Sequence, residues 1–427
     1  MKICVLSFHC CPLSPIGGEG VGGMNVYLKE LCSALANDPN TEIDIFTRAQ
    51  NPGMSRIKRM MPNVRVIHLP AGPECFIDRK SLYDYLPEFV ENLKGFMSKA
   101  KKNYDVIYTH YWLSGLAGEY LKHYFGLPLV HTYHTLAFLK NRVSNEHEQR
   151  NRLLAERHLS FAADLIISSS SEEKINLIRE YGISAQKIRV IYPGVNQNLF
   201  YPSKTGTVYR KSGFSEDHQI LLYVGRVEPI KGLLTVIKAL ALINHSDHPL
   251  SEKLKLIIIG GGKEGTELSQ NIEVSRVMSA VKAFGLSNKI VFLGSIEQTE
   301  LKNYYSTADA LMVPSLYESF GLVVVEALAC GTPVLVSNVG KMRTIVKEGK
   351  NGYSFAPGSP ESLKNKLVEF SLKKDHFWEK EKIRRDIIER FSWDKTERET
   401  RQVFASLKTE KILTTTIFRR DESPQPA

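Results

Sequence analysis

Short apolar runs alternate with helical stretches along this chain, and the alternation occurs in two separate series. The first series of runs comprises Ile3 to Phe8, Ile43 to Thr47, Val64 to Leu69, Val106 to Tyr108, Leu129 to His131 and Leu165 to Ser168. The second comprises Ile220 to Val224, Leu254 to Ile259, Ile290 to Leu293, Ala310 to Val313 and Val334 to Val336. Short buried strands joined by helices are typical of parallel sheets covered on both faces. The sequence therefore predicts an α/β protein in which one architecture occurs twice.

A stretch rich in Pro, Gly and Asn, from Tyr192 to Pro202, separates the two series and indicates the crossing between domains. The predicted first domain covers residues 1–196 and the second covers 197–393. A length of 427 residues exceeds a single hydrophobic core, in agreement with two domains. A helical segment is expected at 394–415, and the polar tail at 416–427 is expected to be disordered.

The composition is that of an ordinary globular enzyme, with 43% apolar and 24% charged residues. No apolar segment approaches the roughly 20 residues of a membrane span, and the first apolar run is too short for a signal peptide. The six cysteines show no metal-type spacing and are expected to be reduced and mostly buried. These features predict a cytoplasmic location.

The formal net charge of +10 allows three kinds of partner: nucleic acid, an anionic membrane surface or phosphorylated substrates. The basic residues are scattered, and no basic strand studded with aromatic residues or zinc-finger spacing is present, so we expect no nucleic acid. Peripheral membrane contact and phosphorylated substrates stay open. The sequence contains no coiled-coil pattern specific to a dimer, so the oligomeric state stays open.

The run E-S-F-G-L-V-V-V-E, between Glu318 and Glu326, lies where a strand gives way to a helix. The backbone N–H groups expected at the helix start belong to Ser319, Phe320, Gly321 and Leu322. Such free N–H groups form a positive helix terminus that suits a phosphate, and glycine allows close approach. The eight-residue spacing corresponds to a helical rise of roughly 12 Å, which would let the two carboxylates bind the sugar and ribose hydroxyls of a nucleotide diphosphate sugar.

Two basic residues follow the first strand of the second series. Arg226 and Lys231 lie in the pattern G-R-x-x-x-x-K-G, at the carboxyl end of a predicted parallel strand. Open α/β sheets bind ligands at that edge, and two cations there can offset the charge of a departing diphosphate. Further glycine-containing turns near Gly261 and Ile296 would bring bare backbone to the nucleotide.

Glycines near the N-terminus allow a different reaction class. Residues 18–23 formally match G-x-G-x-x-G, which favours an NAD(P)-dependent oxidoreductase. A dinucleotide fingerprint follows the first strand directly, whereas residues 9–16 intervene here, and the second strand ends at Arg48 rather than at an acid. We expect Gly22 and Gly23 to form a mobile loop that leads into a helix from Asn25 to Ala36 and contacts a phosphate. A non-catalytic nucleotide- or glycan-binding module is a third class.

The order of these motifs, with H-T-x-H-T-L at 131–136 and F-S-W at 391–393, resembles retaining glycosyltransferases of family 4 over nearly the whole chain. This family includes sucrose-phosphate synthases and the first glycosyltransferase of mycothiol synthesis. The resemblance implies the GT-B fold, with two facing Rossmann-like domains and an interdomain cleft. It also implies an acceptor site on the first domain, a nucleotide site on the second, and a C-terminal helix that packs back on the first domain.

The resemblance also assigns roles to residues. The catalytic set is His134, Glu318, Arg226 and Lys231. The donor-binding set is Gly22, Gly23, Arg226, Lys231, Gly261, Ile296, Glu318, Ser319, Phe320, Gly321, Leu322 and Glu326. The acceptor-binding set is Asn25, Lys80, Tyr111, Thr135 and Arg152, with Arg79 as an alternative to Lys80 and Arg150 or Arg157 as alternatives to Arg152. His110 and His131 are expected to be structural.

The implied reaction is transfer of a hexosyl group, with retention, from a nucleotide diphosphate sugar to an acceptor hydroxyl, such as that of a sugar phosphate. UDP is the family's usual nucleotide. A glycogen- or sucrose-type synthase and a transferase acting on a lipid-linked glycan remain alternatives. No cofactor and no essential metal are expected, because no D-x-D run occurs and no helix presents histidines at i, i+4 with a carboxylate.

Overall fold

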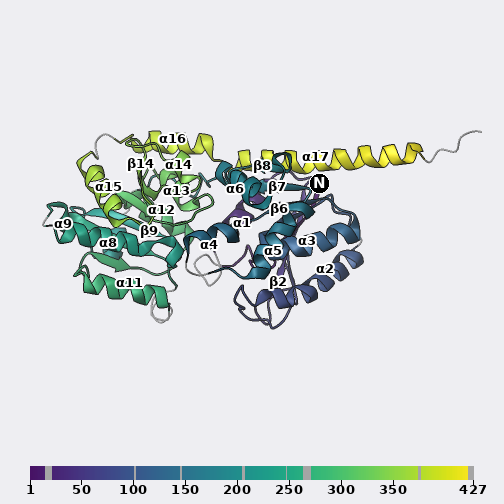
Figure 1. The fold of residues 1–427 in the computed structure, drawn as a ribbon, viewed down its shortest axis with the longest axis horizontal. Helices are drawn as coiled ribbons and strands as arrows, with labels where there is room; N and C mark the ends of the chain where they lie inside the picture. The colour runs from purple at the N-terminus through teal and green to yellow at the C-terminus, as the bar shows by residue number, and fades with distance from the viewer. Residues whose placement is uncertain are drawn as a thin grey trace, which may run out of the picture.

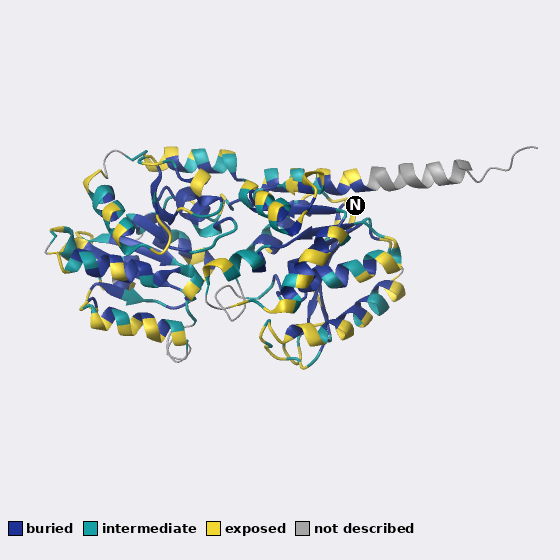
Figure 2. Ribbon diagram, viewed as in Figure 1, coloured by how far each residue is buried: buried dark blue, intermediate teal, exposed yellow. Residues whose placement is uncertain are grey.

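The computed structural model of this chain contains two separate sheets, each flanked by helices (Figure 1). The structure describes residues 1–14, 22–100, 102–144, 147–203, 207–246, 248–262, 271–373 and 377–421. Each sheet has its own apolar clusters, and Figure 2 shows the strands as the most deeply buried parts of both halves. The prediction of a repeated α/β architecture is confirmed.

The first sheet has eight strands in the order β3-β4-β2-β1-β5-β6-β7-β8. Its strands are β1 (Lys2–Leu6), β2 (Glu42–Arg48), β3 (Ile57–Met61), β4 (Val64–Leu69), β5 (Val106–His110), β6 (Leu129–Thr132), β7 (Leu165–Ser168) and β8 (Ile188–Val190). Its helices are α1 (Gly23–Leu35), α2 (Leu86–Ala100), α3 (Tyr111–Phe125), α4 (Ala137–Val143), α5 (Arg150–Ala162) and α6 (Ser171–Tyr181). Only β3 pairs in the antiparallel direction among these described strands.

The second sheet has six parallel strands in the order β11-β10-β9-β12-β13-β14. These are β9 (Gln219–Val224), β10 (Leu254–Ile259), β11 (Ile290–Phe292), β12 (Ala310–Val313), β13 (Val334–Ser337) and β14 (Gly352–Phe355). The accompanying helices are α7 (Thr207–Ser212), α8 (Leu233–Asn244), α9 (Leu250–Lys253), α11 (Ile272–Ala283), α12 (Gln298–Thr307), α13 (Leu322–Ala329), α14 (Met342–Ile345), α15 (Pro360–Leu372) and α16 (Lys380–Arg390). Short 3₁₀ turns occur at Leu82–Tyr85, Ala185–Lys187 and Pro229–Lys231.

Both faces of each sheet are buried because successive side chains of a strand point in opposite directions. In β1, Cys4 and Leu6 join the cluster that includes α2, α3 and α5, whereas Ile3 and Val5 join the cluster beneath α1. This double burial explains why the central strands appear in the sequence as continuous apolar runs.

Three strands escaped the sequence prediction, namely β3, β8 and β14. Each lies at an edge of its sheet, where one side pairs with no further described strand. Edge strands need not be apolar on both faces, and β3 in particular is largely exposed. The apolar-run criterion therefore finds the central strands but only one of the four edge strands, β11, whose apolar run Ile290 to Leu293 was recognised.

The C-terminal helix α17 (Trp393–Asp421) leaves the second domain and lies against the first (Figure 1). Trp393, Val403, Phe404 and Leu407 pack in the apolar cluster that also holds α1. The helix runs past residue 415, the end expected from the sequence, because no Pro or Gly interrupts it before Pro424. Residues 422–427 lie outside the described residues.

Five of the six free cysteines are buried, and Cys75 is exposed. Within the described ranges, no helix combines the length and the apolar character that crossing a membrane requires.

Candidate active site

The turn from β12 to α13 carries the two glutamates singled out in the sequence. Gly321 caps α13 with φ of 91°, a left-handed conformation that L-residues other than glycine adopt at a cost. The turn places Glu318 beside Lys231, whose Nζ lies 2.6 Å from Glu318 Oε2. Two candidate residues from separate sequence motifs are thus in direct contact.

Arg226 and Lys231 both follow β9, at the edge where parallel strands end. The Arg226 guanidinium forms an ion pair with the Glu228 carboxylate, and the two side chains are 38% and 36% exposed. The backbone carbonyl of Arg226 accepts a 2.8 Å hydrogen bond from the Tyr223 hydroxyl, which fixes the start of this loop. Both cations stay partly open to solvent and can exchange their carboxylate partners for a ligand.

The start of α1, in the first domain, lies against this region of the second domain. A Cβ added to Gly22 would stand 3.8 Å from Arg226 Nε, and one added to Gly23 would stand 3.5 Å from Leu322 Cδ1. Tertiary structure thus brings the glycine loop, the Arg226 side chain and the start of α13 together. Residues 18–21 of the G-x-G-x-x-G match lie outside the described residues.

Glu326 lies inside α13 and is only 6% exposed. The Tyr305 hydroxyl donates a 2.8 Å hydrogen bond to its carboxylate. Burial, with a smaller contribution from the nearby Glu30 of α1, raises the pKa of Glu326 to about 7. Near neutral pH, this carboxyl group therefore exchanges readily between its two protonation states.

His134 has a left-handed backbone, with φ of 63°, which is rare for a residue with a side chain. Its Nε2 lies 2.9 Å from His110 Nδ1, and its ring meets the Tyr27 ring edge-on at 5.1 Å. Burial lowers the pKa of His134 to about 3, so the imidazole is neutral at physiological pH. His131 is fully buried and contacts the Thr109 hydroxyl at 2.8 Å.

Two hydrogen bonds join the loop at 134–136 to the second domain. The Ser319 hydroxyl donates to the His134 carbonyl at 2.6 Å, and the Leu136 N–H donates to the Tyr317 hydroxyl at 3.1 Å. Leu136 is the N-cap of α4 and has no side-chain cap of its own. Tyr317 escaped the sequence analysis, although it directly precedes Glu318, because only the fold reveals its partner.

Three of the predicted acceptor residues form one cluster. Arg152 donates from Nη2 to the Thr135 hydroxyl at 2.9 Å, and its guanidinium lies 4.8 Å from the centre of the Tyr111 ring. It also pairs with Glu148 at 2.9 Å and with Glu156 at 2.7 Å. Two carboxylates therefore neutralise the buried Arg152 charge.

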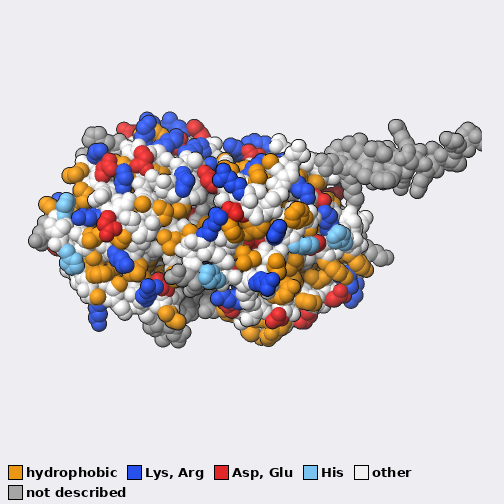
Figure 3. Space-filling view, viewed as in Figure 1, with side chains coloured by type: hydrophobic (Ala, Val, Ile, Leu, Met, Phe, Trp, Pro, Cys, Tyr) orange, Lys and Arg blue, Asp and Glu red, His pale blue; other side chains and the backbone are white. Residues whose placement is uncertain are grey.

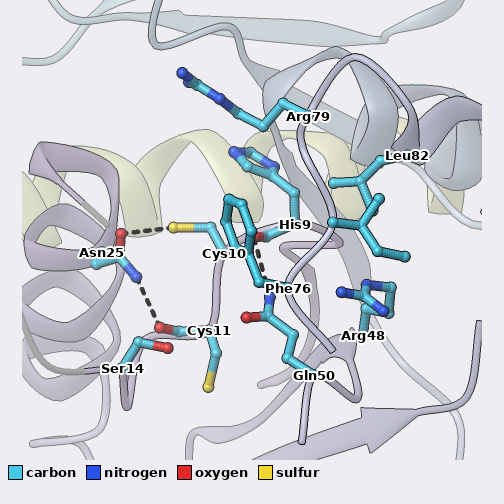
Figure 4. Close-up of a pocket in the computed structure, with 11 residues that line it drawn as sticks. His9, Cys10, Cys11, Ser14, Asn25, Arg48, Gln50, Phe76, Arg79 and Leu82 are labelled. Atoms are coloured by element: carbon cyan, nitrogen blue, oxygen red, sulfur yellow. Dashed lines mark hydrogen bonds between the residues drawn. The ribbon is translucent and has the colours of Figure 1, made fainter. Parts of the chain in front are cut away.

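The remaining acceptor candidates are differently placed. Asn25 is buried, and its amide donates to the Cys11 carbonyl at 2.7 Å while its oxygen accepts from the Gly22 N–H at 3.0 Å. Lys80 is exposed and does not line the cavity shown in Figure 4, whereas its neighbour Arg79 does. The turn at 78–81 thus directs these adjacent side chains differently, with Arg79 at the cavity and Lys80 in solvent.

Two of the donor candidates lie on turns that follow neighbouring strands. At the turns after β10 and β11, the Ser295 N–H donates to the Gly262 carbonyl and the Gly260 N–H to the Gly294 carbonyl, both at 2.8 Å. Gly261 and Ile296 therefore lie on adjoining turns. Phe320, by contrast, is buried among aromatic side chains, with ring centres 6.5 Å from Tyr192 and 5.5 Å from Phe391. The Phe320 side chain therefore packs against aromatic rings in the interior rather than facing solvent.

Across the described part of the chain, no group of three or more His, Cys, Asp or Glu side chains is arranged to hold a metal ion.

Two family models together match most of the chain. Glycosyltransferase Family 4 matches residues 21–199, and Glycosyl transferases group 1 matches residues 207–390. The gap between them falls at residues 200–206.

Curated proteins of similar sequence include two actinobacterial enzymes. D-inositol 3-phosphate glycosyltransferase 2 of Catenulispora acidiphila is 34% identical over 363 residues, which cover 84% of each chain. D-inositol 3-phosphate glycosyltransferase of Corynebacterium glutamicum is 34% identical over 374 residues, covering 86% of this chain and 88% of the relative.

Solved structures of similar fold include sucrose-phosphate synthase from Thermosynechococcus elongatus. It superposes with a TM-score of 0.86 at 32% identity and covers 96% of this chain and 99% of its own. HepE of Anabaena, solved with UDP and glucose, gives a TM-score of 0.71 at 21% identity over 95% of this chain and 100% of its own. At that identity, the second likeness shows the fold alone.

Proposed function

Because this chain belongs to glycosyltransferase family 4, we propose that it transfers a hexosyl group, with retention, from a UDP-sugar to a hydroxyl of a sugar phosphate. That it is a glycosyltransferase with the GT-B fold follows from the family models and from the likeness to sucrose-phosphate synthase. The oxidoreductase and the non-catalytic module are thereby set aside. UDP, retention and the acceptor are the proposed parts.

One observation carries the proposal of a nucleotide-sugar site: a helix start from each domain and two cations of the second domain converge on the same place. Gly22 of the first domain lies beside Arg226, and Lys231 pairs with Glu318 at the turn before α13. A diphosphate placed here would meet two cations and the N–H groups at the start of α13, so its charge would be compensated as it leaves.

The two glutamates would bind the ends of the donor. Glu318 would accept hydrogen bonds from sugar hydroxyls once the diphosphate takes over Lys231. Glu326, buried and bonded to Tyr305, would accept from the ribose hydroxyls. Hydrogen bonds from hydroxyls to a charged carboxylate are stronger than those between neutral groups, which favours binding of the ionised form.

His134 would face the reacting carbon of the sugar. Its pKa of about 3 keeps the imidazole neutral, so it is suited to polarise and position rather than to donate a proton at neutral pH. In the proposed front-face substitution, the departing phosphate oxygen takes the proton of the attacking hydroxyl. The new bond then forms on the face that the nucleotide leaves, which retains the configuration.

The acceptor would lie on the first domain, near Tyr111, Thr135 and Arg152. The curated relatives are named for an inositol phosphate and the similar structure for sucrose phosphate, which supports a phosphorylated acceptor. Transfer to a lipid-linked glycan is the second candidate, which the net charge of +10 favours. A cytoplasmic location and independence from metal ions belong to the same proposal.

A product screen tests this proposal. UDP-, ADP- and GDP-sugars are each incubated with inositol phosphates and hexose phosphates, in the presence of a metal chelator, and nucleotide release is measured. NMR of the product then gives the anomeric configuration. Transfer from a UDP-sugar with the donor's configuration supports the proposal; an inverted product or a strict need for a metal contradicts it.

A further inference from the structure

His110 and His134 are joined by a hydrogen bond between their rings, where the first domain contacts the second. His110 Nδ1 lies 2.9 Å from His134 Nε2, and the ring planes meet at 33° with their centres 5.1 Å apart. His110 is the last residue of β5 and is 0% exposed, whereas His134 is half-buried. A fully enclosed residue of the sheet thus holds the ring of a residue that a ligand can reach.

The backbone at this place adopts a conformation that residues with side chains disfavour. Tyr111, which directly follows His110, has φ of 73°, and His134 has φ of 63°. Across the described part of the chain, these are the only two residues other than glycine with a positive φ. Such residues persist where the surrounding contacts over-determine them, and they cluster at functional sites. His110 links the two, because one follows it in the chain and the other is bonded to its ring.

The backbone and the ring of His134 are held by different domains. Ser319 of the second domain donates to the His134 carbonyl at 2.6 Å, while His110 of the first domain holds the ring. The Tyr27 ring meets the His134 ring edge-on at 5.1 Å, and the Tyr108 ring lies 4.1 Å from that of His110. These contacts restrain the His134 ring, so its other nitrogen, Nδ1, has a defined direction.

The second nitrogen of the His110 ring decides which way the hydrogen bond runs. His110 Nε2 is buried and has no hydrogen-bond partner among the described residues. The hydroxyls of Tyr27 and Tyr108 are occupied, since they contact each other at 3.1 Å and Tyr108 also contacts Thr132 Oγ1 at 3.0 Å. Burial lowers the pKa values of both histidines, so each ring is neutral and carries one proton.

Two arrangements of these protons satisfy the bond, and they differ at the buried nitrogen. If His134 donated from Nε2, His110 would accept at Nδ1 and would carry its own proton on Nε2, as a buried N–H without an acceptor. If His110 donates from Nδ1, its Nε2 is a lone pair instead. Buried N–H groups are left unpaired more rarely than buried acceptors, which favours the second arrangement. His134 then accepts at Nε2 and carries its proton on Nδ1.

Packing alone does not explain a histidine at position 110. An apolar residue of similar size would fill the same space without leaving a buried polar nitrogen unpaired. The imidazole of His110 gains only one hydrogen bond in return, and that bond goes to His134. We therefore look for the role of His110 in what it does to the His134 ring.

Resting on the proposed function, we propose that His110 is a positioning residue that fixes His134 in the tautomer with its proton on Nδ1. His134 then presents an N–H donor to the transferred sugar and binds one of its oxygens, rather than accepting from one of its hydroxyls. His110 itself stays out of reach of the substrate, because the sheet encloses it. This role goes beyond the structural one that the resemblance implied for His110.

His110→Asn and His110→Asp form a matched pair of variants, because their side chains have the same shape. Asparagine can donate from the place of Nδ1, whereas an aspartate can only accept. Long-range proton–nitrogen NMR of protein with labelled histidines gives the tautomer of each ring, and His134→Gln identifies the His134 signals. The kcat for transfer, the KM of the donor and the thermal midpoint are measured on the same samples.

We expect His134 to carry its proton on Nδ1 in the wild type and in His110→Asn, and to carry a proton on Nε2 in His110→Asp. The kcat of His110→Asp should be about tenfold or more below that of His110→Asn, with a similar KM for the donor.

A wild-type His134 with its proton on Nε2 overturns the inference, and this measurement requires no variant to fold. Equal kcat values in the two folded variants overturn it as well. A wild type that has the Nδ1 proton on His134 but releases no nucleotide from any nucleotide sugar instead contradicts the proposed function and leaves the histidine pair standing.

Discussion

At the scale of single residues, burial sets the protonation states that the proposed chemistry needs. Burial raises the pKa of Glu326 to about 7, and it lowers the pKa values of His134 and His131 to about 3. The Glu326 carboxyl group is thereby easier to protonate, and the imidazoles of His134 and His131 stay neutral. These shifts are also stability effects, because the unfolded chain has ordinary pKa values.

The variant Glu326→Gln is expected to stabilise the ligand-free protein. From about pH 4.5 to 7, the folded state holds a proton on Glu326 that the unfolded state has released, so the stability of the wild type falls as pH rises. Glutamine removes this loss, by about 2–3 kcal/mol at about pH 8. Denaturant unfolding at about pH 4.5 and pH 8 measures the difference.

The same variant is expected to bind a UDP-sugar about tenfold or more weakly, since glutamine carries no charge for the ribose hydroxyls. Calorimetry with the intact UDP-sugar, whose phosphates do not titrate near neutral pH, gives the affinity. Unchanged affinity would remove Glu326 from the donor site, whatever its effect on stability.

The buried histidines are expected to make stability depend on pH in the opposite direction from Glu326. His131 stays neutral in the folded state but takes up a proton in the unfolded chain below about pH 6.5, so stability falls as pH falls. Between about pH 7.5 and 5, this one residue should cost about 2 kcal/mol. His131→Gln should flatten the dependence of unfolding free energy on pH by that amount, with the exposed His123→Gln as the control for residue type.

At the scale of elements, a backbone contact at a glycine holds the turn between β12 and α13 in place. This turn carries Glu318 and is called the donor turn below, after its proposed role. The turn before α13 is backed by the segment between β13 and α14, where Gly340 has φ of 51°. A Cβ at this position would come within 2.0 Å of the Glu318 carbonyl oxygen. Glu318 is therefore positioned by a packed backbone as well as by its ion pair with Lys231.

Gly340→Ala should consequently displace the donor turn. Gly349→Ala is the matched control, because Gly349 has φ of 66° but no atom closer than 3.7 Å to an added Cβ. Both variants force alanine into a left-handed conformation, at about 1–2 kcal/mol, and Gly340→Ala adds about 1–3 kcal/mol for the clash. The thermal midpoint and the nucleotide affinity of both variants are measured. Equal effects of the two substitutions would mean that the turn shifts without cost and that the Gly340 contact does not hold it.

At the scale of the whole molecule, the loop at 134–136 joins the two proposed substrate sites. Its carbonyl at His134 and its N–H at Leu136 are bonded to Ser319 and Tyr317 of the second domain, while Thr135 is bonded to Arg152 of the first. Approach of the domains therefore sets the backbone that carries His134. If the proposed function holds, binding of the donor at the turn before α13 is expected to affect the geometry of the loop at 134–136 through these bonds.

Tyr317→Phe should lower kcat for transfer by about tenfold, because Leu136 loses its partner and His134 is less well held. Nucleotide affinity should change little, since the hydroxyl does not face the donor in this proposal, and the share of donor lost to hydrolysis should rise. Tyr124→Phe, on the exposed surface of α3, is the control. A loss confined to the KM of the donor would instead make Tyr317 a donor-binding residue.

The sequence by itself determined the architecture and the positions, at the ends of strands, of most residues of the proposed donor site. Buried parallel strands are apolar on both faces, so the central strands could be predicted, and Arg226, Lys231 and Glu318 follow those strands at fixed short distances along the chain. Gly321 could be recognised in the same way, because a helix that starts in a left-handed conformation favours glycine there.

Only the tertiary structure decided which residues far apart in the sequence contact one another. Neighbours such as Arg79 and Lys80 differ in direction rather than in chemistry, and packing alone turned Arg79 toward the cavity while leaving Lys80 exposed. The hydrogen-bond partner of Tyr317 and the burial of Arg48 are likewise long-range properties. Hydrogen bonding and burial depend on residues far apart in sequence, so no local pattern encodes them.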